Sequence, residues 1–335
     1  MKNTNIEELI EISFEIGRNP AFVQGAGGNT SVKNSKEMFV KASGKHLARA
    51  KDENIFVSVE YKKIQENISK RNEDIFSGQV TDSQNRPSIE TSLHALMPHK
   101  YVVHIHPIEI IPWLVKKKEH LVDKFLDKYN AVWINYYRPG FDLAQGVNAK
   151  LKVSCPDILL LENHGIVVGF NDSSSILEKL NEITGYFSLP PRELRKFEKD
   201  ILKSLSLEID YRMPKYDSIH SLANDPISFN NLSTDSGIIY PDQAIFMNHS
   251  DSIFDHCNVR LIKNKVEAKN PDFIVIKDTG VLISSKASSY INDYLYAHAE
   301  ILKRISEQKI KYLNNSELSI LTNWEPEKYR QQINK

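Results

Sequence analysis

The sequence has few cysteines and no long apolar run, and its formal net charge is zero. Its 335 residues include only Cys155 and Cys257, which lie far apart, so we expect neither a disulfide framework nor a cysteine-based zinc site. The 43 basic and 43 acidic side chains cancel, and the mean hydropathy is -0.41. This balance gives no indication of a nucleic-acid partner or of binding to an anionic membrane surface.

The sequence also shows no pattern typical of a membrane span or of a signal peptide. Apolar runs such as 110–115 and 273–276 are far shorter than the ~20 residues that a membrane span needs. The N-terminal segment 1–17 has acidic residues where a signal peptide needs an uninterrupted apolar stretch. We therefore expect a cytoplasmic protein that has no membrane partner.

The length favours two domains, or one large domain with an appendage. Leu189, Pro190 and Pro191 and the polar stretch 213–235 are interpreted as linkers.

Two histidines on a predicted strand give the clearest chemical signal. The apolar, β-branched segment 101–106 predicts a strand on which His104 and His106 point to the same face. His164 stands in the run LLLENHGIVVG, where an apolar strand turns and resumes. Three neutral imidazoles with one open coordination position indicate a catalytic divalent metal, most consistent with Zn²⁺. Partly buried strand histidines that bond to the backbone are the alternative.

A carboxylate precedes this strand. Pro87 and Ser88 predict the start of a helix with Ser88 at the N-cap, so Glu90 falls in the first turn. His94 lies four residues further on the same face. Glu90 either acts at the site or only stabilises its helix, and His94 is expected to be at most a supporting residue.

Two turns rich in glycine and serine are candidates for anion binding. In GAGGNTS, residues 25–31, the glycines allow consecutive amides to face an anion, and KASGK, residues 41–45, forms a second such turn. The first run leads into a predicted hairpin and not a helix, which argues against a dinucleotide-binding fingerprint. A hairpin loop without a ligand is the alternative.

Tyr136, Tyr137 and Arg138 crowd before Pro139 and Gly140. A phenol or a guanidinium on such a loop can donate a proton or hold an anion, although packing and turn formation explain the same residues.

An internal similarity links two distant segments. Residues 156–168 match residues 271–283 in pattern, with Thr279 where His164 stands. The second half is thus expected to contain a degenerate partial repeat without the metal ligand, and a chance similarity is the alternative.

Five motifs in order resemble one known family. They are GAGGNTS at 25–31, KASG at 41–44, PSIE at 87–90, HIH at 104–106 and ENHG at 162–165. Together they resemble the class II aldolase/adducin family, and most of all the aldolase half of fusions between rhamnulose-phosphate aldolase and alcohol dehydrogenase. The resemblance covers residues 5–190.

The resemblance implies a three-layer α/β/α fold with a mainly antiparallel central sheet. It implies a catalytic domain over 1–205, a smaller C-terminal α/β extension over 211–335, and a metal, usually zinc, on His104, His106 and His164. Glu90 would be the acid/base, with Tyr136 and Tyr137 as candidate proton donors. The implied phosphate pocket consists of Gly28, Asn29, Ser43, Gly44 and Ser88.

The implied activity is metal-dependent cleavage of a small ketose phosphate to dihydroxyacetone phosphate and an aldehyde, by a homo-oligomer. Ser88 is followed by Ile89, where sugar-phosphate aldolases of the family commonly have a second serine. A pentulose-phosphate 4-epimerase, a sugar-acid phosphate decarboxylase and a non-catalytic adducin-like module are the alternatives.

Overall fold

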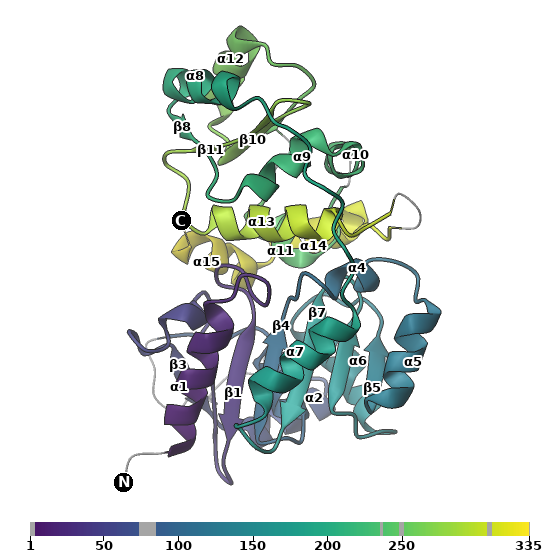
Figure 1. Cartoon of the computed structure of the whole chain (residues 1–335). Helices are drawn as coiled ribbons and strands as arrows, with labels where there is room; N and C mark the ends of the chain where they lie inside the picture. Colours follow the sequence, from purple (N-terminus) through teal and green to yellow (C-terminus); the bar gives the residue numbers. More distant parts are fainter. Residues whose placement is uncertain (1–3, 74–84, 235–236, 248–250, 307–309, 335) are drawn as a thin grey trace. The chain divides into compact units, whose positions relative to one another are not determined.

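The computed structural model describes residues 4–73, 85–234, 237–247, 251–306 and 310–334. It divides into two compact units, residues 1–188 and 189–335, and each unit has a sheet of its own (Figure 1).

The sheet of the first unit has seven strands in the order β3-β2-β1-β4-β7-β6-β5. Neighbouring strands are antiparallel except for β5 and β6, which are parallel. The strands are β1 (Asn29–Lys33), β2 (Met38–Lys41), β3 (Phe56–Val59), β4 (Tyr101–Ile105), β5 (Ala131–Ile134), β6 (Ile158–Leu161) and β7 (Gly165–Phe170). Because β1, β4 and β7 come from three distant parts of the chain, the middle of the sheet gathers residues far apart in sequence.

Helices cover both faces of this sheet. The helices α1 and α7 contact each other on one face, and α2, α3 and α6 contact one another on the opposite face (Figure 1). The helices of the unit are α1 (Thr4–Gly17), α2 (Tyr61–Ser69), α3 (Thr91–Leu96), α4 (Ile111–Leu114), α5 (His120–Lys128), α6 (Phe141–Leu151) and α7 (Ile176–Tyr186), with a 3₁₀ turn at Leu47–Arg49. The expected three-layer α/β/α fold with a mainly antiparallel sheet is confirmed.

The central strands are apolar on both faces because both faces are covered. All residues of β4, β6 and β7 are buried. Such strands read as continuous hydrophobic runs and not as alternating patterns. The two histidines of the HIH motif are thereby placed at the end of a buried strand.

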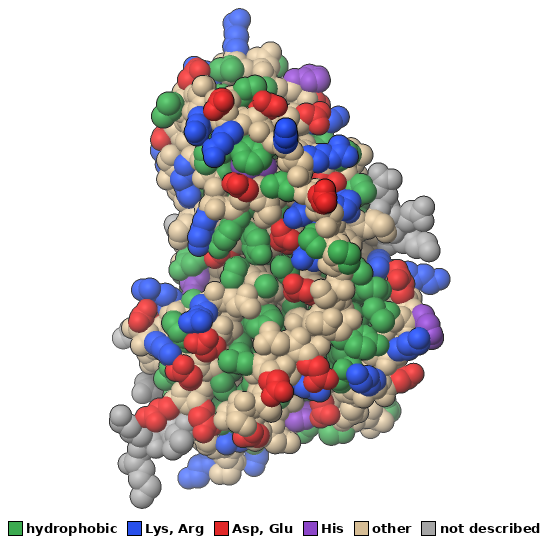
Figure 2. Space-filling model, viewed as in Figure 1, with side chains coloured by type: hydrophobic (Ala, Val, Ile, Leu, Met, Phe, Trp, Pro, Cys, Tyr) green, Lys and Arg blue, Asp and Glu red, His purple; other side chains and the backbone are tan. Residues whose placement is uncertain are grey.

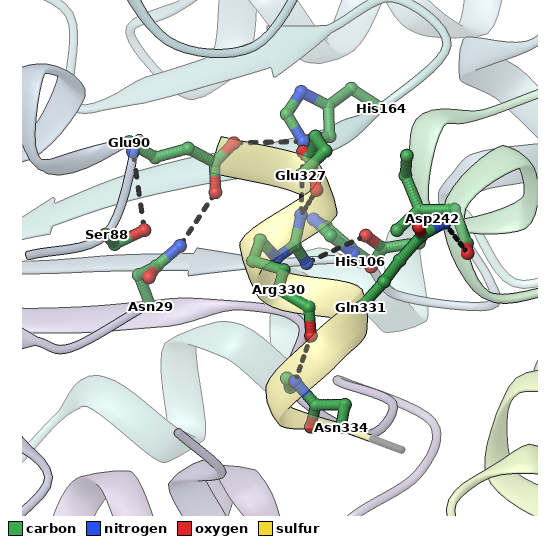
Figure 3. A network of polar contacts seen from close by, with 12 residues as sticks. Asn29, Ser88, Glu90, His106, His164, Asp242, Glu327, Arg330, Gln331 and Asn334 are labelled. Atoms are coloured by element: carbon green, nitrogen blue, oxygen red, sulfur yellow. Dashed lines mark hydrogen bonds and ion pairs between the residues drawn. The ribbon is translucent and has the colours of Figure 1, made fainter. Parts of the chain in front are cut away.

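The second unit has a four-stranded sheet in the order β8-β11-β10-β9. Its strands are β8 (Tyr211–Arg212), β9 (Ile253–Phe254), β10 (Phe273–Ile276) and β11 (Gly280–Ser284). Its helices are α8 (Lys199–Ile209), α9 (Ser221–Asn224), α10 (Pro226–Ser233), α11 (Pro241–Phe246), α12 (Val259–Lys269), α13 (Ile291–Leu302), α14 (Asn315–Asn323) and α15 (Glu325–Ile333), with a 3₁₀ turn at Asp217–His220. Arg330 of α15 pairs with Glu327 and with Asp242 of α11, which ties the last helix to this unit (Figure 3).

Two boundaries differ from the expectation. A first domain over 1–205 would end inside α8, whose Leu202, Leu205 and Ile209 pack in the core of the second unit, so the division lies at 188/189. The stretch 213–235 is not a linker, because most of it folds as the 3₁₀ turn, α9 and α10.

The visible surface carries intermingled basic and acidic side chains, with no large region of one sign (Figure 2). In the described part of the chain, every helix is too short or too polar to cross a bilayer.

Candidate metal centre

Three histidines, in or next to β4 and in the turn before β7, meet at one end of the sheet. His104 lies in β4, His106 directly follows that strand, and His164 lies in the turn between β6 and β7. Because β7 pairs with β4, with His104 opposite Val167, the turn is brought beside the end of β4. Gly165 makes this approach possible, since a Cβ atom there would lie 2.4 Å from the carbonyl oxygen of Ile105.

The three rings point their nitrogens at one place. The Nε2 atoms of His104 and His106 are 3.0 Å apart, and one nitrogen from each of the three histidines lies within 4.8 Å of the others. The Nδ1 of His104 is 2.8 Å from the carbonyl oxygen of Ile166. As donor in that bond, Nδ1 holds the proton, which leaves the lone pair of Nε2 directed at the other rings.

This group of residues fits a divalent metal. All three histidines are buried. Burial lowers the pKa of His164 to about 4, so its ring is neutral at neutral pH, as a metal ligand must be. Three imidazole nitrogens that converge on one place make a poor hydrogen-bonded cluster and a good three-ligand metal site.

Glu90 joins the histidines to the neighbouring strand. Its Oε1 lies 3.0 Å from Nε2 of His164 and 3.3 Å from Nε2 of His104, and its Oε2 accepts a 2.7 Å hydrogen bond from Asn29 (Figure 3). Burial raises the pKa of the Glu90 carboxyl, but its interactions with His104 and His164 outweigh burial and hold the pKa well below its ordinary value. The carboxylate is therefore ionised beside the three rings.

The helix that carries Glu90 begins later than expected. Ser88 is not its N-cap, because α3 starts at Thr91 and Glu90 occupies the capping position. Pro87 pairs with Ala42, and the amide of Ser88 donates to the carbonyl of Lys41, so this segment is extended along β2. The hydroxyl of Ser88 accepts a 3.3 Å hydrogen bond from the amide of Glu90 and supports the turn.

A row of polar side chains on β1 holds α3 along its length. Asn29 bonds Glu90 at the start of the helix, and Ser31 lies 2.8 Å from Nδ1 of His94 in its middle. The ammonium of Lys33 donates to the carbonyls of Met97 and His99, just after the helix, at 2.7 and 3.0 Å. We call Asn29, Ser31 and Lys33 the β1 polar row; all three side chains are buried.

Of the β1 polar row, only Asn29 was identified from the sequence; Ser31 and Lys33 were not predicted. His94, the partner of Ser31, was expected to be at most a supporting residue. Its only signal is the spacing of two residues, which on a strand puts the three side chains on one face. Polar residues at this spacing usually indicate a solvent-exposed face, whereas here α3 covers them.

The two glycine turns and the segment before Glu90 are joined. Gly28 and Gly44 have positive φ values of 64° and 70°, and the amide of Ser43 donates to the carbonyl of Arg86. Lys41, which the sequence did not single out, donates from Nζ to the carbonyls of Ala26 and Lys45 at 2.9 and 2.7 Å. One buried ammonium thus bridges the two turns.

Tyr136 and Tyr137, the two candidate proton donors, have different surroundings. The amide of Tyr136 donates to Glu162, two residues before His164, at 2.8 Å. The ring of Tyr137 lies against Gly146 of α6 and is 41% exposed, and its hydroxyl has no hydrogen-bond partner among the described residues. The structure therefore gathers Glu90, the three histidines and the residues of the two turns, and leaves Tyr137 at the periphery.

Comparison with known proteins agrees with this arrangement. The family described as "Class II Aldolase and Adducin N-terminal domain" matches residues 7–182, more than half of the chain. A curated relative, the uncharacterised oxidoreductase YuxG of Bacillus subtilis, is 33% identical over an alignment of 193 residues that covers 52% of this chain and 28% of YuxG. The chain thus spans little more than a quarter of the length of that relative.

Solved structures similar to this chain include the N-terminal class II aldolase domain of a protein from Thermoplasma acidophilum. It has 25% identity, a TM-score of 0.48, and coverage of 56% of this chain and 93% of that one. An L-fuculose-1-phosphate aldolase from Thermus thermophilus has 15% identity, a TM-score of 0.39, and coverage of 56% and 92%. By the family match over residues 7–182, the chain belongs to the class II aldolase and adducin family.

Proposed function

We propose that the first unit is a metal-dependent aldolase that cleaves a small ketose phosphate to dihydroxyacetone phosphate and an aldehyde. The observation that carries the proposal is the contact of the Glu90 carboxyl group with two of three converging histidines, at 3.0 and 3.3 Å. Family membership supports a lyase of this class. An adducin-like module without catalysis has no need for a buried carboxylate beside a trihistidine group.

His104, His106 and His164 would hold the metal, and Zn²⁺ suits a set of ligands that are all nitrogen. A bound divalent ion polarises the carbonyl and the adjacent hydroxyl of the substrate as a Lewis acid. The bond between Nδ1 of His104 and Ile166 orients the first of these ligands.

Glu90 would move the proton of the reaction. As a carboxylate it accepts the proton of the C4 hydroxyl while the C3–C4 bond breaks and its electron pair moves toward the C2 carbonyl. Protonation at C3 then gives dihydroxyacetone phosphate. Asn29 fixes Oε2 of Glu90, so Oε1 is the oxygen presented to the substrate.

The phosphate would lie against the two glycine turns. Gly28, Asn29, Ser43, Gly44 and Ser88 are the proposed contacts, supported by the positive φ of both glycines and by the bridge that Lys41 makes. Tyr136 and Tyr137 stay candidates for the donor of the proton that C3 takes up after cleavage. We also propose a cytoplasmic homo-oligomer.

A screen of ketose 1-phosphates and related sugar acids on the metal-loaded chain, with products read by NMR, tests the proposal. Net formation of a triose phosphate supports an aldolase. Formation of a stereoisomer without a fragment would indicate a 4-epimerase, and release of carbon dioxide would indicate a decarboxylase; either result would overturn the aldolase assignment.

The first prediction concerns Glu90. Glu90→Gln should leave the metal bound and lower kcat by about 10² to 10⁴, because the general acid/base is removed and the ligands remain. Metal analysis and steady-state kinetics check this. Glu178→Gln, an exposed glutamate in the first turn of α7, is the control and should match the unmodified protein; an unchanged kcat in Glu90→Gln would exclude the role of Glu90.

A further inference from the structure

The sheet of the second unit repeats part of the sheet of the first. In the first unit, β4, β7, β6 and β5 are neighbours, paired antiparallel, antiparallel and parallel. In the second unit, β8, β11, β10 and β9 are neighbours with the same three senses of pairing. The helices also correspond in chain order. In the first unit, α3 precedes β4, α6 lies between β5 and β6, and α7 follows β7. In the second unit, α8 precedes β8, α12 lies between β9 and β10, and α13 follows β11.

The register of the two hairpins is the same residue by residue. The pair Ile158–Val168 of β6 and β7 corresponds to Phe273–Ile283 of β10 and β11, and each pair that follows keeps the correspondence through the turn. The second turn residue is left-handed in both, Asn163 at φ 53° and Asp278 at φ 56°. The left-handed residue at the same step of both turns agrees with the shared register.

Hydrogen bonds to the neighbouring strand also correspond. The amide of Glu162 donates to Ile134 of β5, and the amide of Lys277 donates to Phe254 of β9, both at 2.9 Å. At the other end of the hairpins, the amides of Gly169 and Ser284 donate to Asp157 and Asp272 at 2.8 and 2.9 Å. The shared pattern therefore extends over three strands.

The hydrophobic cores match as well. Each core combines residues of the hairpin, the strands beside it and two helices, and the hairpin residues stand at equivalent positions. The cluster of the first unit contains Leu93, Met97, Val102, Ile134, Leu143, Val147, Leu159, Leu161 and Val167. The cluster of the second contains Leu202, Leu205, Ile209, Tyr211, Ile262, Val266, Ile274, Ile276 and Leu282, with Phe254 and Met213 packed against it.

From this correspondence we propose that the second unit is a copy of the metal-bearing half of the first, in which the ligand positions hold other side chains. Thr279 stands at the position of His164. Tyr211 pairs with Ser284 as Val102 pairs with Gly169. Counted along the sequence from these pairs, Met213 and Lys215 correspond to His104 and His106.

The acidic position is retained in the copy. Glu198 caps α8 as Glu90 caps α3, and the amide of Glu198 donates to the carbonyl of Thr279. The side chain of Glu198 is exposed, unlike that of Glu90. The second unit thus keeps the backbone frame and an acidic residue at the helix start, without an imidazole at any of the three ligand positions. It follows that the second unit binds no metal at these three positions, and that histidines placed there should create a site like that of the first unit.

The test restores these ligands in the full-length chain. The variant M213H/K215H/T279H is loaded with Zn²⁺, freed of excess metal by gel filtration, and analysed for metal and protein. We expect metal content to double, from about one to about two equivalents per chain. An unmodified chain without metal would mean that the proposed aldolase site fails. A gain in the variant from no metal to about one equivalent per chain would then still support the proposal that the second unit is a copy.

The matched control is R212H/K215H/T279H, in which one histidine moves to the adjacent strand residue and hence to the opposite face. It should gain no metal. A folded test variant without a gain, or an equal gain in the control, would overturn the proposal.

Hydrogen exchange on the unmodified chain provides a second measurement that does not depend on the variants. The amides of Lys277 and Ser284 should be protected like those of Glu162 and Gly169, because they make the same hydrogen bonds. Rapid exchange at both Lys277 and Ser284 would also overturn the proposal.

Discussion

At the scale of single residues, the chemistry of the site depends on where the ring nitrogens point. His104 is fixed by its bond to Ile166, and His164 by a turn whose left-handed Asn163 and adjacent Gly165 allow a close approach to β4. These constraints are set by the backbone, so substitution of one ligand should remove metal binding and leave the sheet in place.

The prediction for the ligands uses His104. His104→Ala should reduce the metal retained after gel filtration to below about a tenth of its original amount, because two ligands cannot hold a divalent ion tightly. Circular dichroism should stay that of the folded chain. His120→Ala, at an exposed position at the start of α5, is the control and should keep its metal; full metal content in His104→Ala would exclude the three-histidine site.

A second prediction concerns pH and His94. Burial lowers the pKa of His94 to well below its ordinary value of 6.5. Below about pH 6.5 the unfolded chain therefore binds a proton at this residue that the folded chain does not, so the free energy of unfolding should fall as the pH falls. His94→Gln should make the free energy of unfolding depend less steeply on pH, by the equivalent of up to about one proton taken up on unfolding.

Urea unfolding between about pH 7.5 and about pH 5.5, in the presence of a chelator, measures that slope in both proteins. Equal slopes would show that His94 takes up its proton equally in both states. The chelator removes the effect of pH on metal binding, which would otherwise change the slope in the same direction.

At the scale of elements, β1 and α3 act as one rigid pair. The β1 polar row contacts the start, the middle and the end of a short helix, so α3 cannot slide along the strand without breaking three sets of hydrogen bonds. The position of Glu90 is a result of this pairing.

The prediction for this pair uses Lys33. Burial lowers the pKa of Lys33 to about 7, and its amine still donates to two carbonyls at the end of α3. Lys33→Met should lower the free energy of unfolding by about 1 to 3 kcal/mol, because buried carbonyls lose their donor. Lys36→Met, an exposed lysine in the adjacent turn, should have an effect within about 0.5 kcal/mol; equal effects of the two substitutions would contradict the role of Lys33.

The sequence predicted the elements whose pattern is set locally. The strand at 101–106, the hairpin after the glycine run and the helix before Gly17 follow from β-branched runs, turn residues and helical spacing, and all three are present. The helix expected at Pro87 was wrong because pairing with β2 holds that segment extended, an effect of residues distant in sequence.

The linker expected at 213–235 was wrong for a related reason. Its serine and asparagine content resembles a loop, but Asp225 caps α10, and Leu222 and Phe229 are buried in the second unit. Polar composition identifies loops only where no cap and no apolar spacing is present. More of the candidate site could be identified from the sequence, because His104, His106, His164 and Glu90 stand in short motifs. Ser31, Lys33 and Lys41 were not singled out by any motif.

At the scale of the whole molecule, the chain consists of two units with separate sheets and separate cores. All residues proposed for catalysis and for metal and phosphate binding lie in the first unit. The first unit is therefore expected to be sufficient for metal binding.

The prediction at this scale uses a fragment. Residues 1–188 should form a folded protein that unfolds cooperatively and retains about one metal per chain, because the fragment keeps its complete sheet and helices on both faces. Urea unfolding and metal analysis check this. A fragment carrying His104→Ala is the control, and an aggregated or metal-free fragment would show that the second unit is needed for the site.

The order of the strands has a consequence for how the protein folds. Asn29 pairs with His104, and His104 pairs with Val167, so the central contacts of the site close long loops of chain. Closing such loops costs entropy before the contacts form, which makes this pairing slow in comparison with local hairpins. The three histidines therefore come together only once β1, β4 and β7 have assembled. Metal that binds these histidines acts mainly after the folding barrier and stabilises the completed chain by slowing its unfolding.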